Sequence, residues 1–491
     1  PPSFLKQLVR DINRKTQHQE FQKMLAPQDY CLAVAIMKLL AKKVTGNDTN
    51  GTEGIFVAQA NTWPSEQTMK DTSLFYWDVG SVQKIWNQSG IYICYEEFRS
   101  NVATTFDNII CPLLLKSNPN EYIDNTLPSN EDATTTTPKE RLRNTFLYSL
   151  SLLYSRAHES EEKGEGVCEL LPIIELFNGH SERIDQHIKK RKDDKTVINV
   201  DIARGKWPFI KGSIFRNDSG LSCSAVYASR DIDEGEELII SYGNLSPTGF
   251  ALKYGTIPTD FMKHHNVISD ISIFCDPRLI PQDDMRRKCL EKSGYPLDEL
   301  KNDKNFAIGR LSCGNDSIHD YLNGYEPQTI CSIRQFLILG SCKLMEDELN
   351  RNYTSGRLRG ALYNPQALMH LCDLFQYNIE LLGGKTTSAE DASEASKLDT
   401  PAWKRCCLLA RVSYRESLLM WQRAVALKAR DATYEDVDLP PSLGSGCEVC
   451  GRSYPEMKCG KCKSVGKEIQ YCSRGHQQLN WREHKLACGQ K

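Results

Sequence analysis

The sequence lacks long hydrophobic runs and has no surplus of charge of either sign. Its longest apolar stretch near the start runs from Cys31 to Met37 and ends at Lys38, far short of the ~20 residues that a membrane-spanning helix needs. No charged segment followed by an apolar core opens the chain, as a secretory signal would. With 61 Lys and Arg against 63 Asp and Glu, the net charge of −2 gives no overall attraction to nucleic acid. These absences argue against a membrane protein and against an exported one.

Length and cysteine usage favour an intracellular protein of several domains. The chain has 491 residues, and about 150 residues is typical of one domain. Most of its 19 cysteines are scattered as far as Cys407 without framework spacing, which is typical of buried thiols in a reducing compartment. We therefore expect a nuclear or cytoplasmic location, with a plastid left open. Six cysteines and two histidines crowd instead into residues 447–488, which indicates metal ligands.

Hydrophobic periodicity predicts helices at both ends of a stranded region. Helical patterns cover residues 1–44, 141–156 and 261–432. Short apolar runs predict strands at 170–174, 197–202, 225–227 and 238–242. Polar segments predict a loop at 46–54, an exposed insertion at 116–138, a flexible linker at 383–396 and a boundary at 433–446. An apolar stripe at spacings of three and four predicts a core-facing helix surface: Trp403, Cys407, Ala410, Tyr414, Leu418, Trp421 and Val425.

The C-terminal cysteines and histidines form four pairs with metal-ligand spacing. The pairs are Cys447 with Cys450, Cys459 with Cys462, Cys472 with His476, and His484 with Cys488. A two-residue spacing bends two thiolates onto one ion, and a helical three-residue spacing puts two ligands on one face. Eight ligands make two closed four-coordinate zinc sites, which are structural rather than catalytic. Because so short a segment has little apolar core, zinc must supply its folding free energy.

The end of this cluster resembles the MYND zinc finger. Tyr471 and Cys472, followed by Gln477, Trp481, His484 and Cys488, are similar to the family pattern, with His476 where the family usually has cysteine. The resemblance implies interleaved sites: Cys447, Cys450, Cys472 and His476 on one zinc ion, and Cys459, Cys462, His484 and Cys488 on the other. It also implies a dock for proline-containing peptides of partner proteins. Residues 447–491 hold nine Lys and Arg against four Glu, and this positive charge makes nucleic-acid binding one alternative. A purely structural role of the finger is the other.

Two segments carry a second pattern, in residues 171–181 and 231–243. The first reads LPIIELFNGHS and includes Asn178. The second reads DIDEGEELIISYG, a turn at 233–237 followed by a buried strand that ends at Tyr242. Taken alone, Tyr242 is better explained as a core tyrosine at the end of a buried strand than as a functional residue.

Together and in this order the two segments resemble the SET domain of lysine methyltransferases. Leu252 to Gly255 and the helix containing residues 333–337 are similar to the Rubisco-methyltransferase branch of that family. The implied fold is α+β: a short-stranded SET core with a helical insert (1–255), an all-helical substrate-binding-like domain (256–430), a linker (431–446) and a MYND finger (447–488).

The resemblance implies a function and roles for single residues. The implied activity is S-adenosylmethionine-dependent methylation of a lysine side chain in a protein substrate. Tyr242 would place its hydroxyl beside the transferred methyl group, Tyr254 would wall the lysine channel, and Asn178 would hold the amino-acid part of the cofactor. Glu175 is either a structural carboxylate or a ligand. Asn178 is followed by Gly179, and His180 comes one place later than the family's histidine. Either Gly179 replaces that histidine or one residue is inserted, so His180 is assigned no role.

Residues 1–28 contain no glycine, whereas the family carries a Gly-x-Gly segment before a helix such as 29–43. Either that segment lies upstream of Pro1, or it is lost and the SET core is only a scaffold. The sequence thus leaves three functions open: a lysine methyltransferase, a non-catalytic adaptor that binds partner proteins, and a histidine methyltransferase.

Overall fold

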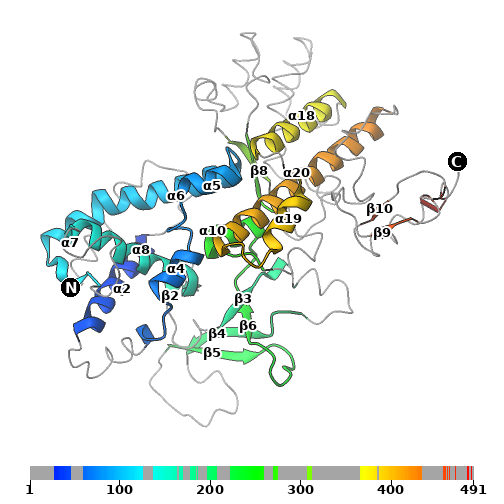
Figure 1. The fold of residues 1–491 in the computed structure, drawn as a ribbon. Coiled ribbons are helices and arrows are strands. Elements are labelled where there is room, and N and C mark those ends of the chain that lie inside the picture. Colours follow the sequence, from blue (N-terminus) through cyan, green and yellow to red (C-terminus); the bar gives the residue numbers. More distant parts are fainter. Residues whose placement is uncertain are drawn as a thin grey trace, which may run out of the picture. The chain divides into compact units, whose positions relative to one another are not determined.

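The computed structural model of the chain is shown in Figure 1. It describes residues 27–45, 59–124, 137–162, 165–169, 177–183, 185, 196–206, 222–258, 269–274, 307–311, 365–383, 386–433, 457–459, 462, 464, 470–471, 484–485 and 488. The chain divides into two compact units that interleave along the sequence: 1–78, 95–243 and 252–256 form the first, and 79–94, 244–251 and 257–491 the second. No helix in the described ranges is both long and apolar enough to cross a membrane. The predicted domain boundaries at 255, 430 and 446 stay predictions.

The helices of the first unit pack through aromatic side chains. They are α2 (Pro27–Thr45), α4 (Glu66–Thr72), most of α6 (Gly90–Thr105), the π-helix η1 (Phe106–Ile110), α7 (Cys111–Lys116), the 3₁₀ helix η2 (Pro119–Glu121) and α8 (Pro138–Arg156). Phe146 on α8 lies between Phe106 and Tyr30, with ring centroids 5.0 and 6.5 Å apart. The helical pattern at 141–156 is confirmed by α8, and that at 1–44 by α2 where the structure describes it; the expected loop at 46–54 lies outside the described residues.

The strands of the first unit form three pairs. They are β1 (His158–Glu162) with β2 (Glu165–Glu169), β4 (Val200–Lys206) with β5 (Ser222–Ala228), both antiparallel, and β3 (Asn178–His180) with β6 (Ile239–Ser241), which is parallel. Strands expected at 197–202, 225–227 and 238–242 are confirmed with shifted ends, and 170–174 lies outside the described residues. The sequence did not predict β1 and β2, because their residues are mostly polar and show no apolar alternation. Buried Val200 and Ile240 form a small core between β4 and β6.

Three helices build the centre of the second unit. They are α18 (Pro365–Leu381), α19 (Ser388–Ser396) and α20 (Ala402–Thr433), and α18 and α20 lie side by side in Figure 1. The expected core-facing stripe on α20 is confirmed for Cys407, Ala410, Tyr414, Leu418 and Trp421, which are buried, whereas Trp403 near the start of the helix is half-buried. Helix α5 (Val79–Trp86) packs on α20, and Trp86 donates its indole N–H to the carbonyl oxygen of Cys407 at 2.8 Å.

The expectation of an all-helical domain over 256–430 is wrong in one place. Strands β7 (Ile271–Phe274) and β8 (Ala307–Leu311) pair antiparallel within that range. The other edge of β7 is covered by side chains. The amide of Asn378 donates to the oxygen of Phe274 at 3.1 Å and accepts from its nitrogen at 2.9 Å, and the hydroxyl of Tyr414 does the same for Ser272, at 2.9 Å in both directions. Helix side chains thus take the place of a neighbouring strand.

The expectation of a flexible linker at 383–396 is also wrong, because most of it forms α19. Thr387 and Glu390 form a capping box: the Glu390 carboxylate accepts from the Thr387 nitrogen at 2.6 Å, and the Thr387 hydroxyl accepts from the Glu390 nitrogen at 3.2 Å. Asp391 is then buried, 2% exposed, and its carboxylate accepts from Arg411 at 2.8 Å and Arg415 at 3.1 Å. The polar composition of residues 383–396 is thus compatible with a helix, because the one buried charge of α19, Asp391, is paired with arginines of α20.

We expect the substitution Asp391→Asn to destabilise the second unit by about 3–5 kcal/mol, because it leaves two buried guanidinium groups without their carboxylate. Urea denaturation followed by circular dichroism measures the change. The matched control is Glu394→Gln on the same helix, which removes an exposed partner of Lys397 and Lys404 and should change stability little. Equal midpoints for the two variants would contradict the structural role of Asp391.

The remaining elements complete the second unit. Helix α10 (Pro247–Tyr254) follows β6, and its last residues belong to the first unit. Near the C-terminus, β9 (Met457–Lys458) and β10 (Gln470–Tyr471) form a short antiparallel pair.

Candidate functional site

The parallel pairing of β3 and β6 brings the two motif segments together. In this register Asn178 faces Ile239, Gly179 faces Ile240 and His180 faces Ser241. The nitrogen of Tyr242 donates to the oxygen of His180 at 3.0 Å and continues the ladder by one residue. Segments about sixty residues apart in the sequence therefore form one edge, with Asn178 at its start and Tyr242 at its end.

Gly179 makes room for the ring of Tyr242. A Cβ atom at position 179 would lie 1.9 to 2.2 Å from three ring carbons of Tyr242, much closer than atoms can approach. The glycine that stands where the resembling family has histidine is thus a steric requirement of this site. No larger side chain fits at 179 while the tyrosine keeps its position.

Tyr242 is half-buried and its hydroxyl has a defined partner. The hydroxyl donates to the carbonyl oxygen of Phe177 at 3.3 Å. Burial raises the pKa of Tyr242, and the nearby charge of Arg156 offsets part of that rise. The phenol is therefore protonated at neutral pH, so it can donate or accept a hydrogen bond but does not act as a base.

Tyr254 stacks on Tyr242. The ring centroids lie 4.5 Å apart with an angle of 25° between the planes, a separation typical of a stabilising aromatic pair. The next residue, Gly255, has φ of +63°, and a Cβ atom there would lie 1.6 Å from the carbonyl oxygen of Thr72. Only glycine fits at this position, so the tight turn after α10 fixes where Tyr254 stands.

Asn178 is exposed at the start of β3, and its side-chain amide donates to the carboxylate of Glu237. Glu237 belongs to the turn expected at 233–237. That turn is confirmed by the hydrogen bond from the nitrogen of Glu236 to the oxygen of Asp233, 3.0 Å, and by Gly235 with φ of +80°. The structure thus brings together the three residues assigned to the site from sequence, Asn178, Tyr242 and Tyr254.

Of the two remaining motif residues, the structure describes His180 but not Glu175. His180 is buried, 6% exposed, and its lack of an assigned role stays a prediction. Glu175 lies outside the described residues, and the choice between a structural carboxylate and a ligand stays open.

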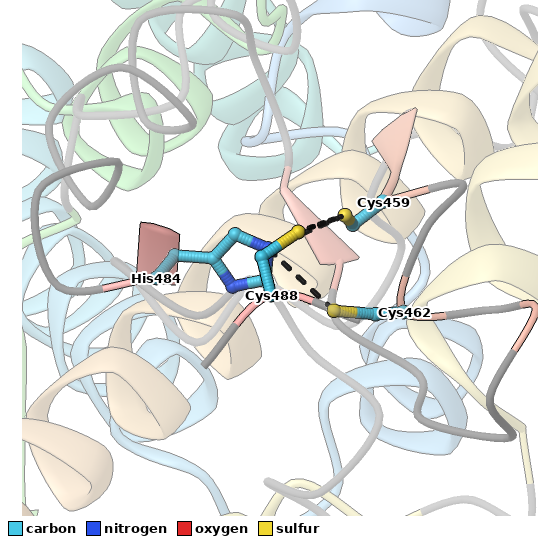
Figure 2. Close-up of side chains that lie close together, drawn as sticks. All are labelled: Cys459, Cys462, His484 and Cys488. Carbon is cyan, nitrogen blue, oxygen red and sulfur yellow. Dashed lines mark hydrogen bonds between the residues drawn. The ribbon is translucent and has the colours of Figure 1, made fainter. Parts of the chain in front are cut away.

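Four of the eight expected zinc ligands form one centre. Cys459, Cys462, His484 and Cys488 place their ligand atoms within 4.8 Å of one another, and Figure 2 shows the side chains pointing toward one another. The sulfur of Cys459 lies 3.6 Å from that of Cys488 and 3.2 Å from Nε2 of His484, which is also 3.6 Å from the sulfur of Cys462. This grouping is the second of the two sets that the family pattern implied.

The donor set fits a tetrahedral zinc ion. Zinc bonds of about 2.3 Å to sulfur and 2.0 Å to nitrogen put tetrahedral ligand atoms roughly 3.5 to 3.8 Å apart, close to the separations observed. Burial by itself would raise the pKa of the Cys459 thiol, but hydrogen bonds from the Cys462 backbone and from His484 lower it to about 6. The folded arrangement of these residues therefore favours the thiolate form of Cys459, which is the form that binds a metal. Four protein ligands leave no open position for a substrate.

The other four expected ligands, Cys447, Cys450, Cys472 and His476, lie outside the described residues, so a second zinc ion stays a prediction. Their chain neighbours are partly described. Cys459 directly follows β9, and Tyr471, the last residue of β10, directly precedes Cys472. The short pairing of Tyr471 with Met457 thus ties the two halves of the module together.

A closed centre of three cysteines and one histidine beside a two-stranded hairpin defines a small metal-binding module of the zinc-finger class. Residues 447–488 match the family model of the MYND finger. A segment of 42 residues is 40% identical to Egl nine homolog 1 from Mus musculus, covering 9% of this chain and 10% of that relative's length.

Solved structures also align with most of the chain. The SET domain of LSMT bound to lysine and AdoHcy is 14% identical, with 88% of this chain and 80% of that chain covered and a TM-score of 0.48. Rubisco LSMT bound to AdoMet is 13% identical, with 88% and 81% covered and the same TM-score. Since TM-scores below 0.5 do not establish a shared fold, the chain's own residues must support any function.

Three residues of the site were given no role from the sequence: Gly179, Glu237 and Phe177. A signal existed for Gly179, because it follows Asn178 where the family has histidine, although an inserted residue explains that difference equally well. Glu237 was read only as part of a turn, and Phe177 contributes a backbone oxygen, which no side-chain pattern reveals.

We expect the zinc-loaded chain to lose at least one equivalent of zinc on the substitution Cys462→Ser, because a hydroxyl is a poor zinc ligand beside two thiolates. Inductively coupled plasma mass spectrometry of the dialysed protein measures the metal. The control is Cys31→Ser, a half-buried cysteine on α2 whose pKa is raised to about 11 by burial. Unchanged zinc content in Cys462→Ser would remove this residue from the centre.

Proposed function

We propose that the chain is an S-adenosylmethionine-dependent protein-lysine N-methyltransferase of the SET type with a MYND finger that docks partner proteins. One observation carries the proposal: β3 and β6 pair so that Asn178, Tyr242 and the stacked Tyr254 stand together. These are the three residues to which the family resemblance gives cofactor and catalytic roles. A protein substrate and an intracellular location belong to the same proposal.

The chemistry needs a neutral amine in a dry, shaped site. Methyl transfer is an in-line displacement in which the lysine nitrogen bonds to the methyl carbon as the carbon–sulfur bond breaks. Free lysine has a pKa of about 10.4, so its neutral form costs about 4.6 kcal/mol at pH 7. Desolvation in a narrow channel lined by side chains such as Tyr242 and Tyr254 disfavours the charged ammonium and reduces this cost. The stacked pair thus supplies a rigid wall for the acceptor side chain.

The hydroxyl of Tyr242 orients the reacting groups. Because its proton is donated to the oxygen of Phe177, the lone pairs of the phenol oxygen remain available to accept weak hydrogen bonds. An electron-poor methyl group on a sulfonium is such a donor. The tyrosine therefore acts as a positioning acceptor and, with its raised pKa, takes no proton from lysine.

The described residues fit the amino-acid end of the cofactor. S-adenosylmethionine supplies an electrophilic methyl group when bound. Asn178, exposed at the start of β3 with its amide held by Glu237, offers an oxygen to a cationic group.

The finger serves as a dock in this proposal. Its described zinc centre is closed by four protein ligands, which suits a binding module rather than a metal-dependent active site. We propose two zinc ions and a proline-containing peptide of a partner as the ligand. The five excess positive charges of residues 447–491 favour an acidic context for that peptide.

Incubation with tritiated S-adenosylmethionine and a protein extract tests the activity. We expect labelled protein, and acid hydrolysis of it to yield methyllysine. Labelled methylhistidine would support the histidine alternative, and absence of label together with absence of cofactor binding would support the non-catalytic adaptor.

The substitution Tyr242→Phe should lower the methylation rate at least about 100-fold, because it removes the oxygen that positions the methyl group. The ring stack and the melting temperature should be retained, since only one hydroxyl is lost. Steady-state kinetics and differential scanning fluorimetry measure the two effects. Full activity in this variant would remove Tyr242 from the catalytic residues.

The substitution Gly179→Ala should lower the methylation rate about as much as Tyr242→Phe does, because the new Cβ atom displaces the Tyr242 ring. The matched control is Gly249→Ala on α10, where the nearest side-chain atom to a Cβ would be 3.4 Å away. Kinetics of both variants provide the test. Equal activity of Gly179→Ala and the parent chain would show that the ring does not need its present place.

A further inference from the structure

The side-chain amide of Asn178 has a defined orientation. An exposed asparagine can exchange the places of its oxygen and nitrogen by rotating half a turn, and the two forms present opposite hydrogen-bonding groups to a ligand. An ionised carboxylate only accepts hydrogen bonds. Glu237 therefore selects the form in which Nδ2 of Asn178 faces it, and Oδ1 is directed away from Glu237.

The backbone of Glu237 is held in place by Asn199. The side chain of Asn199 donates to the oxygen of Glu237 at 2.8 Å and accepts from the nitrogen of Ile239 at 2.8 Å. Asn199 itself is fully buried. Glu237 thus stands on a rigid turn, which is what a residue needs in order to fix another side chain.

The two neighbouring glutamates differ in their partners. Glu236 forms an ion pair with Arg230 and accepts from Asn199 at 3.2 Å, so its charge is compensated. Glu237 is exposed, and in the part of the chain that the structure describes it forms no ion pair with Lys or Arg. The Glu237 carboxylate and the Asn178 Oδ1, which is directed away from it, are both hydrogen-bond acceptors at the start of β3, and acceptors of this kind suit a cation.

We infer that Glu237 is a positioning residue: it orients Asn178 so that Oδ1 accepts a hydrogen bond from the α-ammonium group of the cofactor. The inference rests on the proposed function. The α-ammonium belongs to the amino-acid part of S-adenosylmethionine and of S-adenosylhomocysteine, whereas 5′-methylthioadenosine lacks that part. Glu237 therefore affects the first two ligands and leaves the third unaffected.

Isothermal titration calorimetry of the zinc-loaded chain with S-adenosylhomocysteine and with 5′-methylthioadenosine provides the test. We expect Glu237→Ala to weaken S-adenosylhomocysteine binding about tenfold and to leave 5′-methylthioadenosine binding unchanged. Glu237→Gln keeps an acceptor oxygen but adds a donor group, so it pairs with either orientation of the Asn178 amide and should restore only part of the affinity. The matched control is Glu234→Ala, an exposed glutamate of the same turn, which should bind both ligands like the parent.

Three results would overturn the inference. Unchanged S-adenosylhomocysteine binding in Glu237→Ala would show that Asn178 needs no such partner. Equal weakening of both ligands, with a lower melting temperature, would show that Glu237 only stabilises the turn. If the parent chain bound neither ligand, the proposed function would fail and the role of Glu237 would fail with it. Titration of the parent chain alone gives this result, so it is distinguished from a failure of the Glu237 inference by itself.

Discussion

The site depends on one parallel pairing, that of β3 with β6. Each strand has only three residues, so the pairing is weak by itself and relies on its surroundings. Asn199 supplies part of this support, because its backbone nitrogen donates to the oxygen of Ile239 at 3.1 Å and its side chain bonds to both sides of Leu238. A single buried asparagine thus joins β4 to β6 and holds the Tyr242 strand in register.

Close packing turns this pairing into a specific geometry. A Cβ atom at Gly179 would overlap the ring of Tyr242, and one at Gly255 would overlap the carbonyl oxygen of Thr72. The two tyrosines are therefore placed by different elements, one following a strand and one at a helix end. Such placement suits an orienting role, since rings held by backbone contacts lose little additional freedom when a ligand binds.

In the second unit, buried polar side chains stabilise the fold through hydrogen bonds and ion pairs that the sequence did not predict. The side chains of Asn378 and Tyr414 form hydrogen bonds with the backbone along one edge of β7. The carboxylate of Asp391 accepts hydrogen bonds from two arginines of α20. In a linear sequence these residues are typical of exposed positions, and a polar stretch such as 383–396 is typical of a loop. Polar residues can be buried in regular structure when their hydrogen-bonding groups have partners. The sequence does not show those partners, which is why it did not predict α19 or the β7–β8 pair.

The sequence by itself determined the local features: the helical periodicity of α8 and α20, the turn at 233–237 and the ligand spacing of the finger. Each depends on residues within a few positions of one another. The tertiary structure alone decided which distant residues meet, because a register between short strands and a shared metal centre are set by packing across the chain. The contact of Gly179 with Tyr242, the bond from Asn178 to Glu237 and the grouping of Cys459 with His484 all belong to that second kind.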